Sequence, residues 1–166
     1  MFTAAVITCS DKGVKGLRED TSGEYIKQYL IDFGFTVLDK VIISDTLEVI
    51  EEKLLYFSDV QKVDLIITTG GTGFSPRDNT PEATKKVILR EVPGISEMLR
   101  AESFKLTKQA YLSRGVSGIR NRTLIINLPG SLNAVKQNIS FLDDVLDHGL
   151  KILKLVDTDC GEEKRN

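Results

Sequence analysis

The chain has 166 residues, of which 41% are hydrophobic and 28% charged, and its formal net charge is -2 at pH 7. This length and composition are typical of one globular domain that buries a core without disulfides or a structural metal. Because the net charge gives no general attraction to nucleic acid or to an anionic membrane, neither is expected as a partner, and any anion site must be local.

The two cysteines, Cys9 and Cys160, lie in an apolar run and in a polar tail, and their contexts give no reason to pair them. Without a CxxC spacing they fit a reducing compartment and a chain without structural zinc. The first apolar run, Ala4 to Cys9, is too short for a signal-peptide core, and no later stretch approaches membrane-spanning length. We therefore expect a cytoplasmic protein.

Strands and helices alternate along the chain. Apolar, β-branched runs predict strands over 3–9, 35–43, 63–69 and 123–128. Helical spacing of apolar residues predicts helices over 21–33, 45–57, 80–90 and 95–102, and a long helix over 132–155. This alternation indicates an α/β fold, a single three-layer domain with a mainly parallel sheet and helices on both faces.

Two segments depart from this pattern. Between Thr107 and Arg122 the alternation fails, and an inserted hairpin or an irregular arm is expected there. The last residues are charged, so the domain is expected to span 1–156 and a flexible tail 157–166.

Several helix starts carry capping residues. Thr21 or Ser22 would cap the first helix, capping is also the plain role of Asp20, and Asp45 has the capping-box spacing to Glu48. Thr80 precedes a proline, as an N-cap does. Capping is the plainest role for these side chains, although a cap carboxylate at the mouth of a sheet can also face a ligand.

Four polar or glycine-rich loops follow the ends of predicted strands, at 10–22, 44–45, 70–78 and 129–131. In parallel sheets the carboxyl ends of the strands meet at one edge, and ligands bind there. We therefore expect the four loops to converge on one rim.

The loop after the third strand carries the strongest signal for a ligand. Gly70, Gly71 and Gly73 can take positive φ, and their backbone N–H groups can approach an anion. The next helix points its positive end into the same space. Arg77 adds a cation, whereas Asp78 repels a bare phosphate unless a metal ion lies between them. The loop therefore indicates a metal–phosphate complex, although Asp78 could instead bond its own turn.

The chemistry that these loops favour is nucleotidyl or phosphoryl transfer, which needs positioning and charge neutralisation. There is no CxxC, no histidine cluster and no nucleophile elbow, and the single histidine, His148, lies in a helix far from any loop. Zinc chemistry and histidine-dependent hydrolysis are therefore disfavoured. A flavin or nicotinamide redox protein is the least favoured class, because no dinucleotide fingerprint is present.

A long central motif resembles the molybdopterin-binding family, which includes bacterial molybdopterin adenylyltransferases and the G domains of gephyrin. The motif reads TTGGTGFSPRDNTPEAT, with VITCSDKG before it and INLPGSLNAV after it. The likeness runs from about Thr3 to Lys154. It implies adenylation of molybdopterin by Mg-ATP with release of pyrophosphate, in molybdenum cofactor biosynthesis. It also implies a homotrimer that works with other proteins of that biosynthesis.

The resemblance assigns site residues position by position. Asp45 and Asp78 match the two acidic positions needed for catalysis and would organise the magnesium-bound triphosphate. The part that holds the nucleotide corresponds to Gly70, Gly71, Thr72 and Gly73. Polar positions lining the nucleotide and pterin pockets correspond to Ser10, Asp11, Ser22, Ser113 and Arg114, and the floor to Pro129, Gly130 and Ser131. The terminal phosphate of molybdopterin would attack the α-phosphorus of ATP, with Arg114 or Arg77 neutralising charge.

One loop departs from the family pattern, since the chain has Pro129-Gly130-Ser131-Leu132 where the family often has Pro-Gly-Asn-Pro.

Two other functions remain open. A non-enzymatic pterin carrier or scaffold would not need both Asp45 and Asp78. A nucleotide pyrophosphatase on a related domain would consume ATP without a pterin.

Overall fold

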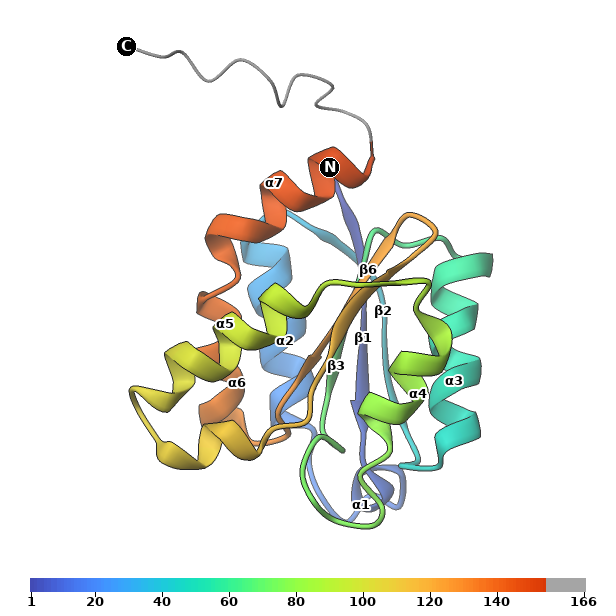
Figure 1. Cartoon of the computed structure of the whole chain (residues 1–166). Coiled ribbons are helices and arrows are strands. Elements are labelled where there is room, and N and C mark those ends of the chain that lie inside the picture. Colours follow the sequence, from blue (N-terminus) through green and yellow to red (C-terminus); the bar gives the residue numbers. More distant parts are fainter. Residues whose placement is uncertain (155–166) are drawn as a thin grey trace.

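In the computed structural model, which describes residues 1–154, a six-stranded sheet carries helices on both faces (Figure 1). The strands are β1 (Thr3–Cys9), β2 (Thr36–Ile43), β3 (Leu65–Thr69), β4 (Arg90–Glu91), β5 (Ser117–Arg120) and β6 (Thr123–Leu128). The helices are α1 (Asp11–Val14), α2 (Thr21–Asp32), α3 (Leu47–Leu55), α4 (Thr80–Val87), α5 (Pro93–Phe104), α6 (Leu132–Ser140) and α7 (Asp143–Leu153). The predicted three-layer α/β fold is confirmed. The predicted tail, 157–166, and Cys160 lie outside the described residues.

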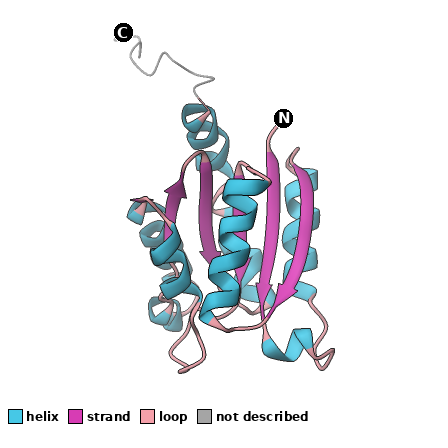
Figure 2. Cartoon of the chain, turned by 90° about the vertical axis from the view of Figure 1, so that its right-hand side faces the viewer, coloured by secondary structure: helices cyan, strands magenta, loops and turns pink. Residues whose placement is uncertain are grey.

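The strand order is β2-β1-β3-β6-β5-β4. The four long strands β1, β2, β3 and β6 are parallel, whereas β5 runs against β6 and β4 against β5 (Figure 2). The turn between β5 and β6 contains Asn121, whose φ of 51° is a conformation that asparagine tolerates better than most residues. The irregular segment predicted over 107–122 is thus a 3₁₀ helix, Lys108–Leu112, followed by one strand of a hairpin.

Two apolar cores lie on opposite faces of the sheet. Along β1, Ala4 and Val6 belong to the core under α2, α5, α6 and α7, and Ala5 and Ile7 to the core under α3 and α4 (Figure 1). Because both faces are buried, the strand reads as a continuous apolar run rather than an alternating one. Within residues 1–154, no helix combines the length and apolarity that crossing a membrane requires.

The long helix predicted over 132–155 is wrong, because the chain turns between α6 and α7. At 1.5 Å per residue an unbroken helix would span roughly 36 Å, whereas a strand of six residues covers about 20 Å. At the break the Leu142 N–H bonds the Ile139 carbonyl, and the Leu142 side chain is fully buried. The turn therefore keeps both halves on the sheet, and His148 in α7 is exposed.

The predicted end of the helix over 80–90 is also wrong. The helix α4 stops at Val87, and the Leu89 N–H donates to the Ile119 carbonyl at 2.9 Å. The next two residues form β4, so pairing with the β5 hairpin ends the helix earlier than the apolar spacing indicates.

Candidate active site

The four loops converge at one rim of the sheet, as predicted (lower end in Figure 1). They surround a cavity of about 370 Å³, which we call the carboxylate cavity. The predicted site residues that line it are Ser10, Asp11, Ser22, Asp45, Gly70, Gly71, Asp78 and Gly130. The sequence did not single out its cationic lining residues Lys12 and Arg18.

Gly70 and Gly71 allow the loop after β3 to pack closely against its neighbours. Their φ angles are 94° and 64°, so the predicted positive φ is confirmed for both. A Cβ on Gly70 would lie 2.4 Å from the Cys9 carbonyl oxygen, and one on Gly71 would lie 2.4 Å from Thr80 Oγ1. Side chains are therefore excluded at both positions. Gly73 does not have positive φ, so that part of the prediction is wrong.

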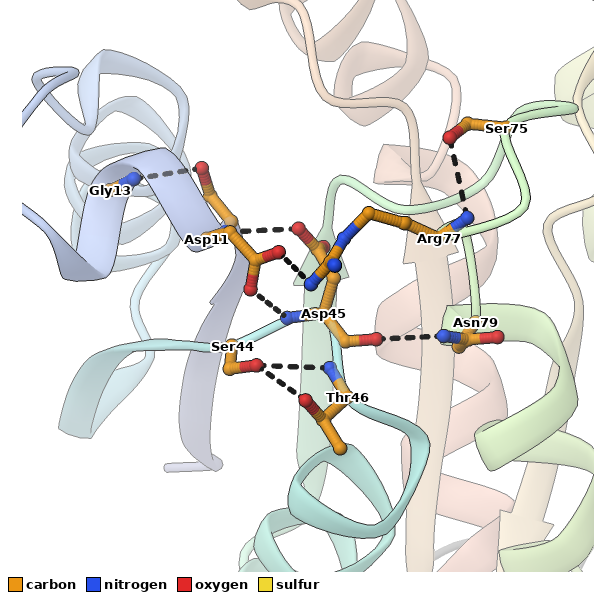
Figure 3. Close-up of polar contacts among 9 residues, drawn as sticks. Asp11, Gly13, Ser44, Asp45, Thr46, Ser75, Arg77 and Asn79 are labelled. Atoms are coloured by element: carbon orange, nitrogen blue, oxygen red, sulfur yellow. Dashed lines mark hydrogen bonds and ion pairs between the residues drawn. The ribbon is translucent and has the colours of Figure 1, made fainter.

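Asp11 and Asp45 join the loops that follow β1 and β2 (Figure 3). The Asp11 N–H donates to Asp45 Oδ2 at 2.9 Å, and the Asp45 N–H donates to Asp11 Oδ1 at 3.2 Å. The capping role predicted for Asp45 is wrong, since the N-cap of α3 is Thr46 and has no side-chain cap bond. The Asp45 carboxylate instead satisfies a backbone donor 34 residues away.

The cavity concentrates negative charge. Burial raises the pKa of Asp45 above its usual range, and the carboxylates of Asp11 and Asp78 push it the same way. The pKa of Asp11 is lowered, chiefly by the hydrogen bond from the Asp45 N–H. Arg77 forms an ion pair with Asp11 across the cavity mouth and is largely exposed (Figure 3). This arrangement favours a ligand that brings compensating positive charge.

Asp78 bonds its own turn, which was one of the two roles open to it. Its Oδ2 accepts the Ser75 N–H at 3.0 Å, while Oδ1 has no hydrogen-bond partner within the described part of the chain. The free oxygen and its place in the cavity lining leave the carboxylate able to face a ligand as well.

A magnesium ion fits this donor set only together with a phosphate ligand. Across residues 1–154 no three carboxylate, histidine or cysteine groups are close enough to hold a metal ion by themselves. Magnesium is usually held by one or two carboxylates, with phosphate oxygens and water completing its shell. Asp45 and Asp78 could supply those two carboxylates.

A second cavity, of about 340 Å³, lies on the α5 and α6 side of the glycine loop, and we call it the amide cavity. Apolar side chains such as Leu99 line it together with the amides of Asn127 and Asn138 and with Arg100. The predicted site residues found here are Thr72, Gly73, Ser113, Pro129 and Ser131. The structure therefore divides the predicted set between two neighbouring cavities.

The sequence analysis missed the helical residues of the amide cavity. Asn138 is buried and donates to Ser103 Oγ at 3.1 Å, so α5 and α6 share a polar contact inside their packed faces. A polar residue on the apolar face of a predicted helix is the signal that could have found it.

The loops around the cavities are held by side-chain contacts. Ser22 Oγ donates to the Gly130 carbonyl at 2.9 Å, and Ser131 caps α6 by accepting the Ala134 N–H. The cap of α2 is Asp20, which accepts the Gly23 N–H, so the capping role expected of Asp20 is confirmed and the caps predicted at Thr21 or Ser22 are wrong. Ser10 caps the short helix α1 in the same way.

The cap predicted at Thr80 is wrong too. Asn79 occupies the N-cap of α4, and Thr80 Oγ1 donates to the Gly70 carbonyl at 2.9 Å. Both residues fix neighbouring loops, since Asn79 Nδ2 also donates to the Asp45 carbonyl at 2.9 Å. Arg114 lies behind the glycine loop and is not among the residues lining either cavity.

Comparison with known proteins gives a consistent result. The chain matches a family described as "Probable molybdopterin binding domain" over residues 5–148. It is 42% identical over 134 residues to a molybdopterin adenylyltransferase of Helicobacter pylori (strain J99), which covers 80% of this chain and 76% of that protein. It is 40% identical over 153 residues to the molybdenum cofactor synthesis protein cinnamon of Drosophila melanogaster, covering 92% of this chain. The chain spans only 26% of the length of cinnamon.

A solved structure shares the fold at high similarity. The molybdopterin biosynthesis enzyme MoaB from Thermus thermophilus superposes with a TM-score of 0.87 at 42% identity. The match covers 92% of this chain and 96% of that one. The architecture described above is thus that of a known group of proteins, over nearly its whole length.

Proposed function

The chain belongs to the molybdopterin-binding domain family, and from this premise we propose that it is a molybdopterin adenylyltransferase. It transfers AMP from Mg-ATP to molybdopterin and releases pyrophosphate, in molybdenum cofactor biosynthesis. The observation that carries this proposal is the carboxylate cavity, where Asp45 and Asp78 share one space with the glycine loop. Two carboxylates beside a phosphate-type loop suit a metal-bound triphosphate.

In the reaction, an oxygen of the terminal phosphate of molybdopterin attacks the α-phosphorus of ATP. A new P–O bond forms, the bond from the α-phosphorus to the bridging oxygen breaks, and pyrophosphate leaves with that electron pair. Magnesium, when bound with the nucleotide, neutralises charge on the phosphates. The protein's part is to position the two reactants and to stabilise the charge that develops.

Each group of the carboxylate cavity has a part in this proposal. Asp45 and Asp78 would hold the metal, and the backbone of Gly70 and Gly71 would lie against the phosphates. Arg77 is 68% exposed at its side chain, so it can exchange the Asp11 carboxylate for a phosphate oxygen. In the resting site Asp11 thus supplies the negative charge that the substrate replaces.

The amide cavity suits a planar heterocycle. Apolar walls with a few fixed polar groups are the usual lining of a small-molecule site. Pterin and adenine both carry ring edges that exchange hydrogen bonds with amide groups. Ser113 and Ser131 line this cavity and would contact the part of the substrate that continues toward the phosphates.

The test is pyrophosphate release from Mg-ATP, measured with and without molybdopterin, for the wild-type protein and for Asp78→Asn. We expect release that requires the pterin and is lost in the variant. Release without the pterin would identify a nucleotide pyrophosphatase instead. Pterin binding without any release would identify a carrier or scaffold.

The proposal extends to a homotrimer in the cytoplasm, acting beside other proteins of cofactor biosynthesis. Large apolar side chains are exposed from the end of α5 to the 3₁₀ helix, namely Phe104, Leu106, Tyr111 and Leu112. Such a surface is typical of a contact with another protein. Light scattering of the purified protein measures the assembly directly, and a monomeric mass would contradict the trimer.

A further inference from the structure

Arg114 uses each of its nitrogens to hold the glycine loop or the helix that follows it. Its backbone N–H donates to the Thr72 carbonyl at 2.9 Å, and its Nε donates to the Gly73 carbonyl at 2.7 Å. Its Nη2 donates to the Asp78 carbonyl at 2.6 Å, and its Nη1 forms an ion pair with Glu82. One side chain therefore holds both ends of the loop that carries Asp78 and the first turn of the helix that follows.

The charge of Arg114 is already compensated. Glu82 lies on α4 and pairs with the guanidinium, and unlike Arg77 the guanidinium also donates to two backbone carbonyls, so its donors are already engaged within the protein. Arg114 instead lines a third hollow, on the surface of the loop that carries Asp78, together with Phe74, Asp78 and Asn79. Its geometry is that of a support for the loop rather than that of a group directed at a substrate.

The segment around Arg114 is anchored from the other side. Arg100, on α5, donates through Nη1 to the Gly115 carbonyl at 2.9 Å and to the Ser113 carbonyl at 3.5 Å. Arg100 also lines the amide cavity, as do Ser113 and Gly115. Two arginines thus connect the wall of the amide cavity to the loop of the carboxylate cavity.

We propose that Arg114 is a positioning residue, which holds the glycine loop so that Asp78 is presented to the carboxylate cavity and which touches no substrate. This inference rests on the proposed function for its kinetic consequence. It replaces the sequence-based expectation that Arg114 contacts the substrate, and it leaves Arg77 to neutralise the developing charge.

The first test is kinetic and uses Arg114→Gln, Arg114→Lys and Glu82→Gln. A loop displaced by about 1 Å can cost roughly 100-fold in turnover, so we expect Arg114→Gln to lower kcat by about that factor and to raise KM for ATP much less. Lysine keeps the charge but has a single nitrogen, which cannot serve Gly73, Asp78 and Glu82 together. Arg114→Lys is therefore expected to be as impaired as Arg114→Gln.

Glu82→Gln should lower kcat in the wild-type background and have little further effect in Arg114→Gln. The matched control is Arg120→Gln, because Arg120 likewise combines a carboxylate partner, Asp59, with a backbone carbonyl, that of Val87, but lines neither cavity. A near-normal kcat in Arg114→Lys, or a raised KM with unchanged kcat in Arg114→Gln, would identify a direct phosphate ligand and overturn the proposal.

The second test needs no substrate and no activity. Hydrogen–deuterium exchange of the ligand-free protein is followed in peptides that cover residues 70–80. Arg114→Gln should exchange faster there than wild type, and Arg120→Gln should not. Equal exchange in all three proteins would refute a positioning role, whether or not the protein proves to be an adenylyltransferase.

Discussion

Asp11 and Asp45 exchange hydrogen bonds, with each carboxylate accepting the backbone N–H of the other. Two neighbouring loops are thereby locked together at the cost of placing two carboxylates at one cavity. A neutral pair would lock the loops with less repulsion, so the two charges do not serve the stability of the site alone. In the function proposed above, a metal-bound phosphate would compensate them.

Replacing Asp11 separates the contribution of its hydrogen bond from that of its charge. Asp11→Ala leaves the Asp45 N–H without its acceptor and should lower the free energy of unfolding, whereas Asp11→Asn keeps an acceptor oxygen and should lower it less. Urea unfolding of both variants measures this difference. Equal losses would mean that the hydrogen bond from Asp45 contributes nothing.

Gly70 is the position at which an added methyl group is least tolerated in the loop. Gly70→Ala would meet the Cys9 carbonyl oxygen at 2.4 Å in a left-handed conformation, and should destabilise the fold by roughly 2–4 kcal/mol. Gly94→Ala is the matched control, since nothing lies within 4 Å of its added Cβ. Thermal unfolding of both variants tests this, and similar melting temperatures would show that the loop can move aside.

Cys9 should be unreactive in the folded protein. Burial raises the pKa of its thiol to about 12, from an ordinary value of 9.0. In a Cys160→Ser background, where Cys9 is the sole cysteine, a thiol reagent at pH 8 should modify it only after denaturation. Rapid modification under native conditions would show that this end of β1 opens readily.

The raised pKa of Cys9 also predicts a pH dependence of stability. Because the folded value lies above the unfolded one, the contribution of the thiol is complete below pH 9 and is lost as the pH rises toward 12. Cys9→Ser and wild type should therefore converge in stability at the alkaline end of that range. A constant difference from pH 8 to pH 11 would contradict this prediction.

The ion pair of Asp59 and Arg120 predicts a pH dependence of stability that is opposite to that of Cys9. The hydrogen bond and charge of Arg120 lower the pKa of Asp59 below its usual 3.8, so its contribution is present above that value and is lost as the pH falls through the folded pKa. The advantage of wild type over Asp59→Asn in chemical denaturation should shrink in acid. If wild type remained more stable than Asp59→Asn in strong acid, the shape of the Asp59 side chain, and not its charge, would account for the stabilisation.

Patterns within short stretches of the sequence predicted those features that are determined by residues close together in the chain. The β-branched run before Gly70 predicted β3, and strand direction alone predicted the rim where the loops meet. The partner of Asp45 could not be predicted, because it lies 34 residues away in the chain. The helix spacing after Leu132 gave no sign of the break at Leu142, which depends on the width of the sheet below it.

The same limit applies within the site. The family resemblance indicated Arg114 as a site residue, but its side chain is directed by Glu82 and by carbonyl groups of the glycine loop, which only the folded chain brings near. The helical residues of the amide cavity were missed because they come from two helices that are far apart in the sequence. Contacts between segments that are distant in the sequence determine both the orientation of Arg114 and the lining of the amide cavity.

The two cavities share their boundary. Gly70 and Gly71 line the carboxylate cavity, whereas Thr72 and Gly73 line the amide cavity. In the loop after β6, Gly130 lines the carboxylate cavity, whereas Pro129 and Ser131 line the amide cavity. A molecule that places a phosphate group in one cavity and a ring in the other is bound bivalently, and release requires both ends to detach together. In the proposed reaction, the conjugate made from the two substrates would therefore leave more slowly than either substrate.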